Sequence, residues 1–402
     1  MSVVVVVGAS HAGFQVAASL RQAKFPGRVV LIGEETGLPY HRPPLSKEFL
    51  TGAMAEDGLR LRPAAFYQKA NVELIDGVRA TAIARAERRL TLSDGRTIAY
   101  DHLVLATGAR HRVLPIPGCE LDGVIALRTR DEAAALRAAL AEARNVVIVG
   151  AGFIGLEAAV VAEKHGARVT ILEMAPRPLA RAVSGHISDA MAAAHRAWGA
   201  DLRTGVSARG FRGEAGRVTA VETSAGEVLA ADLVIVGIGV LPNVELARDA
   251  GLATENGILV DDHLRTADPA VSAIGDCAAF PSPFAGGVVR LESVQNATDQ
   301  GRCVANRIAG RPEAYTAVPW FWSDQGPLKL QIVGLTTDHD HAVLRGDPAG
   351  AFSVFCFRGE RLLGIESINR PADHMAGRKI LGGPASLTPS QAADERFDLA
   401  AA

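Results

Sequence analysis

The chain has 402 residues, of which 48% are hydrophobic, 41 are glycine and only 5% are aromatic, a composition that excludes a disordered or fibrous protein and suits an α/β fold with many tight turns. Its formal net charge of −2 supplies no overall positive field to bind nucleic acid or an anionic membrane surface. The N-terminus has neither the basic start nor the long apolar core of a signal peptide, and no apolar run is long enough to span a bilayer, so we expect a cytoplasmic protein.

The chain begins with a predicted buried strand, Val3–Val7, that leads into a glycine-containing turn over residues 8–13. A helical stretch follows, and a second strand, Arg28–Ile32, ends just before Glu34. Strand, glycine turn, helix, strand and acid in this order form the dinucleotide-binding fingerprint, although Ser10 occupies the position of the middle glycine. Such a turn lets a pyrophosphate approach the backbone at the helix N-terminus, where free N–H groups favour an anion.

Two elements lie between this fingerprint and its repeat. An apolar strand ends at small residues over 103–108, as a second one does over 233–239, which leaves room for a ligand at the carboxyl edge of a parallel sheet. Thr129 and Glu132 have the spacing of a capping box and predict a helix that reaches about Ala143. We interpret this helix as connecting structure.

The fingerprint then occurs a second time. The strand Asn145–Val149 leads into a turn over residues 150–155 that has all three glycines, and the strand Arg168–Leu172 ends at Glu173. One glycine motif is weakly specific, but two copies with strand, helix and acid in place predict two nucleotides in one chain. A flavin and a nicotinamide are the obvious pair, because NADH gives two electrons together as hydride and a flavin can pass electrons on singly.

Further segments carry a more specific resemblance. Together with the fingerprints they make the chain resemble the FAD-dependent NADH:ferredoxin reductases of the putidaredoxin, rhodocoxin and palustrisredoxin reductase family, which serve bacterial haem-thiolate monooxygenases. The match covers nearly the whole chain. The segments are residues 40–47, 106–108, 275–278, 290–297, 319–325 and 368–375.

The resemblance implies an α/β fold of two Rossmann-like dinucleotide-binding domains, as in glutathione reductase, plus a smaller α+β C-terminal domain with an antiparallel sheet. It implies an FAD-binding domain over 1–108 and 241–315, an NAD-binding domain over 109–240 and a C-terminal domain over 316–402. The sequence of the last domain independently predicts strands over 329–333, 341–345, 352–357 and 362–367, with a hairpin turn at 358–360.

The resemblance also assigns roles to individual residues, with no metal among them. We expect Lys47, Glu157 and Trp322 to act at the reacting rings. The residues implied to bind FAD are Gly8, Ala12, Gly13, Glu34, Arg42, Lys47, Ala80, Arg128, Asp276, Val294 and Trp322. The residues implied to bind NADH are Gly152, Ile154, Gly155, Glu157, Glu173, Arg181, Gly239, Glu292, Ser293 and Trp322.

Some of these residues have a plain structural alternative. Lys47 could be an exposed residue in the first turn of a helix capped by Ser46, Trp322 could be a core aromatic, and Glu157 could be an exposed helix residue. Glu173 would repel a 2′-phosphate and favour NADH over NADPH, although Arg177 and Arg181 lie close enough to weaken that argument.

The expected reaction is the transfer of a hydride from NADH to FAD, followed by single-electron transfer to two molecules of a 2Fe-2S ferredoxin. Disulfide and peroxide chemistry is disfavoured, because no two of the four cysteines form a Cys-x-x-Cys pair and the region near residue 42 has none. Two alternatives remain open. One is a reductase of the same fold for rubredoxin, an oxygenase ferredoxin or monodehydroascorbate, and the other is a redox-sensing interaction protein.

Overall fold

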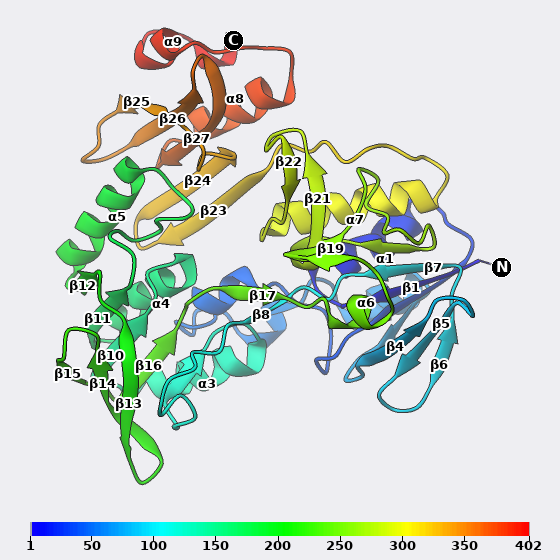
Figure 1. Ribbon diagram of the computed structural model, residues 1–402, viewed down its shortest axis with the longest axis horizontal. Helices are drawn as coiled ribbons and strands as arrows, with labels where there is room; N and C mark the ends of the chain where they lie inside the picture. The colour runs from blue at the N-terminus through cyan, green and yellow to red at the C-terminus, as the bar shows by residue number, and fades with distance from the viewer. Residues whose placement is uncertain (1, 402) are drawn as a thin grey trace. The chain divides into compact units, whose positions relative to one another are not determined.

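The computed structural model describes residues 2–401, which form two compact units, each assembled from segments distant in sequence (Figure 1). The first unit contains the chain up to His41, Asp57–Arg110 and Leu241–Pro319. The second contains Arg42–Glu56, His111–Val240 and the chain from Trp320 onward. Within the described residues, no helix combines the length and the apolar composition needed to cross a bilayer.

A five-stranded parallel sheet in the order β20-β7-β1-β2-β3 is the centre of the first unit. Val4 and Val6 of the central strand pack with the helices α1 and α7 on one face, whereas Val5 and Val7 pack on the opposite face with the neighbouring small sheets. Alternate side chains of a strand point to opposite faces, so a strand of five valines is buried on both. The elements are β1 (Val3–Val7), β2 (Arg28–Ile32), β3 (Val72–Ile75), β7 (His102–Leu105), β20 (Val271–Ala273), α1 (His11–Gln22) and α7 (Val294–Ile308).

An antiparallel sheet, a mixed sheet and short helices complete this unit. The three-stranded sheet consists of β4 (Ala80–Ala84), β5 (Arg89–Leu92) and β6 (Thr97–Ala99), and the four-stranded sheet consists of β18 (Thr254–Glu255), β19 (Gly257–Leu259), β21 (Ala278–Ser282) and β22 (Gly287–Val289). The short helices are η2 (Glu56–Leu59), α2 (Ala64–Lys69), α6 (Glu245–Asp249) and η3 (Gly275–Cys277), while β8 (Ala109–His111) and β17 (Val240–Pro242) lie where the chain passes from one unit to the other.

The second unit repeats the parallel architecture, with a five-stranded sheet in the order β12-β11-β10-β16-β9. Thr129 and Glu132 form the predicted capping box, but the helix that they begin ends at Leu140, three residues before the predicted end. The elements are η1 (Pro43–Ser46), β9 (Val124–Ala126), α3 (Arg130–Leu140), β10 (Asn145–Val149), α4 (Phe153–Lys164), β11 (Arg168–Glu173), α5 (Gly185–Trp198), β12 (Asp201–Thr204), β13 (Ala208–Glu214), β14 (Arg217–Thr223), β15 (Val228–Ala230) and β16 (Leu233–Val236).

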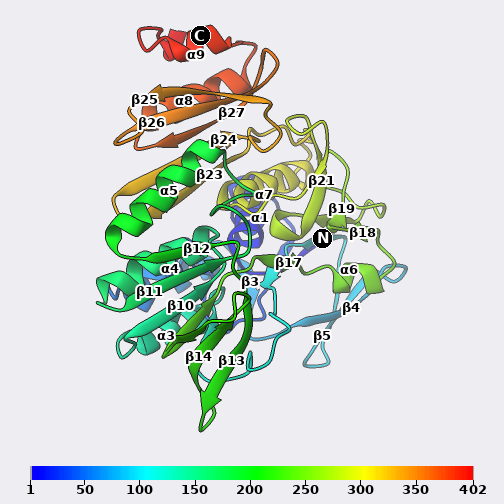
Figure 2. The same cartoon turned by 60° about the vertical axis from the view of Figure 1, so that its left-hand side comes forward.

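An antiparallel sheet in the order β23-β24-β27-β26-β25 forms the C-terminal part of the second unit, drawn in orange and red in Figures 1 and 2. The four predicted strands are confirmed, and Gly359 with φ of +56° makes the predicted hairpin turn. A fifth strand, β23, was not predicted. The elements are β23 (Trp320–Gln325), β24 (Leu328–Gly334), β25 (His341–Gly346), β26 (Phe352–Arg358), β27 (Arg361–Ile368), α8 (Pro371–Gly382), α9 (Pro389–Ala393) and η4 (Leu399–Ala401).

Candidate active site

The glycine turn between β1 and α1 leaves no space for side chains at two positions. Gly8 has φ of +113°, and a Cβ on it would lie 2.0 Å from the carbonyl oxygen of Ala106 at the end of β7. A Cβ on Gly13 would lie 1.9 Å from the carbonyl oxygen of Gly8. The helix therefore begins directly against the strands, and its first N–H groups face a cradle of backbone, which fits an anionic pyrophosphate.

The turn between β10 and α4 has the same construction. Gly150 has φ of +102°, and a Cβ on it would lie 2.5 Å from the carbonyl oxygen of Gly237 after β16. A Cβ on Gly155 would lie 2.2 Å from the carbonyl oxygen of Gly150. Only Gly152 has room for a side chain, since the nearest atom to its Cβ position is 3.7 Å away. Each unit thus holds one backbone cradle of the kind that binds a dinucleotide.

The acids that follow the two turns differ in how they are held. Glu34 is exposed and pairs only loosely with Arg79, at 3.6 Å. Glu173 accepts hydrogen bonds from the backbone N–H groups of Ala151 at 2.7 Å and Ala175 at 2.8 Å. Both oxygens of the Glu173 carboxylate are therefore fixed beside the glycine turn, where a ribose would lie.

The two arginines near Glu173 have different environments. The guanidinium of Arg177 donates to three carbonyl oxygens of its own loop, those of Ala180, Val183 and Ser184. Arg181 is exposed, and its guanidinium lies 3.6 Å from the position that a Cβ on Gly239 would take. Arg177 consequently stabilises the loop, and Arg181 is the cation directed to the carboxyl edge of the sheet.

A second group of predicted residues in the first unit surrounds the start of α7. Ser293 caps this helix, because its hydroxyl accepts from the N–H of Asn296 at 3.0 Å, and Val294 is the first helical residue. Arg290 donates to the carbonyl oxygen of Asp276 at 3.1 Å and pairs with Glu292 at 2.7 Å. The hydroxyl of Ser293 thus has a structural role as a helix cap.

The most concentrated polar cluster of the second unit surrounds Glu157 on α4. Lys47 lies 2.7 Å from its Oε2, the Ser46 hydroxyl donates to the same oxygen at 2.5 Å, and the Ser323 hydroxyl donates to Oε1 at 2.7 Å. Glu157 is only 5% exposed, so the alternative of an exposed helix residue is wrong. The reason is that α4 is covered on this side by η1, with Lys47 directly after it, and by β23, and these segments supply the three donors.

Lys47 is not in the first turn of a helix capped by Ser46, so that alternative is also wrong. Ser46 is the last residue of the short helix η1, and Lys47 is the C-cap residue that follows it, with φ of −131° and ψ of −107°. The prolines at its start hold this segment in a tight 3₁₀ turn, which directs both side chains to one acceptor. The carboxylate and the ammonium are both mostly buried, and a charge can stay out of water in this way only when it has a partner and hydrogen bonds.

The remaining predicted residues fall into two groups. In the second unit, Arg42 donates to the carbonyl oxygen of Arg128 at 2.5 Å, and the N–H of Arg128 donates to Glu132 at 2.8 Å. Trp322 is partly exposed on β23, with its ring 5.6 Å from that of Trp320, so it is not a fully buried core aromatic. The predicted residues of the first unit are Gly8, Ala12, Gly13, Glu34, Ala80, Asp276, Glu292, Ser293 and Val294, and those of the second are Arg42, Lys47, Arg128, Gly152, Ile154, Gly155, Glu157, Glu173, Arg181, Gly239 and Trp322.

Sequence reasoning missed the polar side chains behind Glu157. Gln325 donates to the Ser323 hydroxyl at 3.2 Å, and its amide oxygen lies 2.9 Å from Nε2 of His195 on α5. A signal existed for two of them, because Ser323 and Gln325 are two residues apart and so share one face of a strand. His195 carries no local signal, since its partner is 130 residues away.

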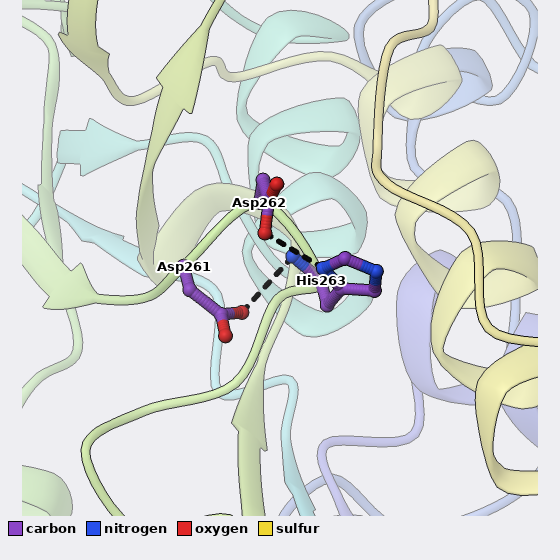
Figure 3. A group of neighbouring side chains, drawn as sticks. All are labelled: Asp261, Asp262 and His263. Carbon is purple, nitrogen blue, oxygen red and sulfur yellow. Dashed lines mark hydrogen bonds and ion pairs between the residues drawn. The ribbon is translucent and has the colours of Figure 1, made fainter.

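A cluster of possible metal ligands lies after β19 in the first unit (Figure 3). His263 Nδ1 is 2.7 Å from Asp262, as Figure 3 shows, but Asp261 already accepts from the N–H groups of His263 and Arg265 and from the Arg265 guanidinium. The loop's own donors satisfy this carboxylate, so the cluster stabilises a turn.

Each of the four cysteines is unpaired, and three of them have shifted acidity. Burial raises the pKa of Cys277, of Cys356 and of Cys303, the last to about 11. The thiolate is the reactive form of cysteine, so burial keeps these three thiols unreactive at neutral pH.

Comparison with known proteins gives consistent matches over the chain. The family described as "Pyridine nucleotide-disulphide oxidoreductase" matches residues 2–301, and the family described as "Reductase C-terminal" matches residues 320–402. Rhodocoxin reductase of Rhodococcus erythropolis is 49% identical over 397 residues, which cover 98% of this chain and 93% of that protein.

Two solved structures are similar over nearly the full length. The ferredoxin reductase for the CYP199A2 system of Rhodopseudomonas palustris has a TM-score of 0.97 and 52% identity, with 99% of each chain covered. The reductase in a covalent putidaredoxin reductase–putidaredoxin complex has a TM-score of 0.96 and 41% identity, with 99% of this chain and 97% of the other covered.

Proposed function

Since the chain belongs to the pyridine nucleotide-disulphide oxidoreductase family and has that family's reductase C-terminal domain, we propose that it passes electrons from NADH through FAD to a 2Fe-2S ferredoxin that serves a haem-thiolate monooxygenase. The chain is an oxidoreductase that uses FAD and NADH, and the predicted family and fold are confirmed. Its activity is that of a ferredoxin reductase.

The observation that carries the proposal is the presence in one chain of two glycine turns of the same construction, each followed by its own acid. The first turn fits the pyrophosphate of FAD, and we assign Gly8, Ala12, Gly13 and Glu34 to it, because its glycines at 8 and 13 let α1 begin directly against the strands, where a Cβ would clash with backbone. The further residues assigned to FAD are Arg42, Lys47, Ala80, Arg128, Asp276 and Val294.

The second turn fits the pyrophosphate of NADH in the same way. Glu173 is held by two backbone N–H groups beside that turn, in the place from which an acid accepts a hydrogen bond from a ribose hydroxyl. The residues assigned to NADH are Gly152, Ile154, Gly155, Glu173, Arg181 and Gly239, with Glu157, Glu292, Ser293 and Trp322 around the nicotinamide.

FAD, when bound, accepts a hydride and releases electrons one at a time. The part of this chain in that chemistry is to orient the rings and to place charge beside them. The Lys47 ammonium, held at 2.7 Å by Glu157, is the positive charge that we assign to the reduced ring, whose negative charge it stabilises. No step requires a thiol.

The partner is a ferredoxin, and we propose one of the 2Fe-2S type. The similarity to a reductase that forms a complex with putidaredoxin supports this proposal. A small electron carrier that docks only transiently needs complementary charge more than a large buried area, so its association rate falls with salt. We further propose that the enzyme works in the cytoplasm, where four unpaired cysteines stay reduced.

The division into an FAD domain over 1–108 and 241–315, an NAD domain over 109–240 and a C-terminal domain over 316–402 is also our proposal. It is supported by one dinucleotide turn in each nucleotide domain and by the match of the reductase C-terminal family from residue 320.

Cytochrome c reduction by NADH, with and without a panel of ferredoxins, tests the function. We expect a 2Fe-2S ferredoxin to stimulate the rate and the stimulation to fall as salt rises. No stimulation by any 2Fe-2S protein would refute the proposal. A rubredoxin as the best acceptor would favour the related reductase activity, and slow flavin bleaching with a long-lived charge-transfer complex would favour a redox sensor.

A further inference from the structure

A line of buried hydrogen bonds continues from Glu157 into the interior of the second unit. The Ser323 hydroxyl joins the carboxylate to Gln325, and Gln325 joins it to His195. Ser323, Gln325 and His195 are each 0% exposed. The line links three elements, α4, β23 and α5, which also lie near one another in Figure 2.

Hydrogen-bond chemistry gives this line one direction. A carboxylate only accepts, so the Ser323 hydroxyl donates to Glu157 and must accept from the amide N–H of Gln325. The amide oxygen of Gln325 then accepts from Nε2–H of His195. All three donors point toward Glu157, and aligned hydrogen bonds of this kind strengthen one another.

The same chemistry shows what this line does not do. The amide nitrogen of Gln325 has no available lone pair, so a proton cannot pass through it from Ser323 to His195. His195 is held neutral, because burial lowers its pKa against the opposing effect of the Gln325 hydrogen bond. Its Nδ1 is buried and has no hydrogen-bond partner among the described residues, so the line ends there.

We propose that Ser323, Gln325 and His195 are positioning residues, which fix the Glu157 carboxylate and through it the Lys47 ammonium for hydride transfer. Glu157 is held from two sides: Ser46 and Lys47 bind one oxygen, and Ser323 binds the other. Without Ser323, the carboxylate can rotate and carry the ammonium with it. The inference rests on the proposed function, because that function makes Lys47 and Glu157 part of the reacting centre.

Two variants of the FAD-loaded enzyme test this role. Gln325→Met has a similar volume and removes both polar ends, and Ser323→Ala removes the one hydroxyl that touches Oε1. In stopped-flow mixing with excess NADH, we expect each variant to reduce its flavin roughly tenfold more slowly, with less change in NADH affinity, because misplaced groups slow a reaction more than they weaken binding. Unchanged rates in both variants would overturn the proposal.

The same sheet offers a matched control. The hydroxyl of Ser353 on β26 donates to that of Ser367 at 2.9 Å, both residues are 0% exposed, and β26 is three strands away from β23. Ser353→Ala therefore removes one hydroxyl of a buried hydrogen-bonded pair without touching Glu157. We expect this variant to have lower thermal stability and an unchanged flavin reduction rate. A slowdown equal to that of Ser323→Ala would assign the effect to loss of packing and overturn the positioning role.

Nitrogen-15 NMR of the histidine-labelled holoenzyme gives a readout that does not depend on turnover. We expect His195 to be neutral with its proton on Nε2, and Gln325→Met to change its Nε2 signal. A proton on Nδ1 instead would overturn the proposed direction of the line. A wild-type enzyme that shows the expected His195 signal but reduces no ferredoxin would refute the proposed function alone.

Discussion

The two glycine turns have nearly the same backbone, yet the helices that follow them carry different polar side chains. Gly8 and Gly150 stand at φ of +113° and +102°, and Gly13 and Gly155 are equally crowded against the turn. Counted from these glycines, Glu157 on α4 stands where α1 has Gln15. Gln15 donates to Ser19 within its own helix, whereas Glu157 gathers donors from two distant segments.

A second pair of equivalent positions lies near the C-terminal ends of α1 and α4. Arg21 on α1 donates to the carbonyl oxygens of Phe25, Gly27 and Asn71. These hydrogen bonds connect the C-terminal end of α1 to the loop that follows it and to the loop before β3. Glu163 stands at the same position of α4, and one of its oxygens is buried without a partner among the described residues. The two turns therefore share one backbone geometry, while each helix adapts its polar positions to its own surroundings.

The largest expected effect comes from adding a side chain at the first glycine of each turn, in two separate variants. Gly8→Ala and Gly150→Ala each place a Cβ against a carbonyl oxygen, at 2.0 Å and 2.5 Å, in a backbone conformation that alanine rarely adopts. We expect Gly8→Ala to be purified without flavin, and Gly150→Ala to keep its flavin while its KM for NADH rises about tenfold or more, the effect of about 1.4 kcal/mol. Absorbance spectra and steady-state kinetics check both. A yellow Gly8→Ala enzyme with normal KM would contradict the assignment of the first turn to FAD.

The next largest effect is expected from substituting Glu173, with Glu34 as its counterpart in the first unit. Glu173→Gln replaces one of the two carboxylate oxygens that accept from backbone N–H groups and removes the charge that opposes a 2′-phosphate, whereas Arg177 stays bound to its own loop. We expect the ratio of kcat/KM for NADH to that for NADPH to fall about tenfold. The control is Glu34→Gln in the first unit, which should leave that ratio unchanged because Glu34 is exposed and assigned to FAD. An unchanged ratio in Glu173→Gln would remove this acid from cofactor choice.

A smaller effect is expected from Glu163, whose substitution should change the thermal stability in a way that depends on pH. Burial raises the pKa of Glu163 to about 7 from its ordinary value of 4.5, so the folded protein binds this proton more tightly than the unfolded chain does. The contribution to stability is present below pH 4.5 and is lost as pH rises to about 7. Glu163→Gln should therefore melt higher than the wild type at pH 8, by on the order of 1 °C, and show a clearly smaller difference at pH 5.

Thermal melts at both pH values check this prediction. Glu142→Gln, at an exposed position of the same unit, is the control and should shift the melting temperature equally at both values. A Glu163→Gln variant that is less stable than the wild type at pH 8 would mean that the carboxylate has a favourable partner there.

The smallest expected effect is at the middle position of each turn. Ser10 and Gly152 both have an extended backbone, with φ of −104° and −80°, and a Cβ at Gly152 would meet nothing closer than 3.7 Å. We expect Ser10→Gly and Gly152→Ser to change flavin retention and the KM for NADH by about twofold or less, because backbone freedom is not needed here. Fluorescence of released flavin and steady-state kinetics measure the two changes. A large loss in Gly152→Ser would show that the nucleotide needs the space that the turn leaves.

Local patterns were sufficient for the strands and turns of the two dinucleotide-binding fingerprints. The strands β1, β2 and β10 have the predicted bounds, because in each of them the last four residues are apolar and buried on both faces. The turns were predictable because glycine is needed where φ is positive and where a helix meets a carbonyl oxygen, as at Gly8 and Gly13. The strand β23 was missed, since its inward face carries Ser323 and Gln325 in place of apolar residues.

The sequence by itself thus determined the two cradles and their acids, since each set lies within one strand–turn–helix–strand segment. It also determined the family of the chain, because the family's motifs are short segments that can each be read from the sequence. Only the tertiary structure decided the environment of Glu157. Its donors Ser46 and Ser323 lie 111 and 166 residues away along the chain, and no local period relates residues at such separations. Packing of α4 against η1 and β23 buries the carboxylate, and a buried charge must find its partners wherever the fold brings them.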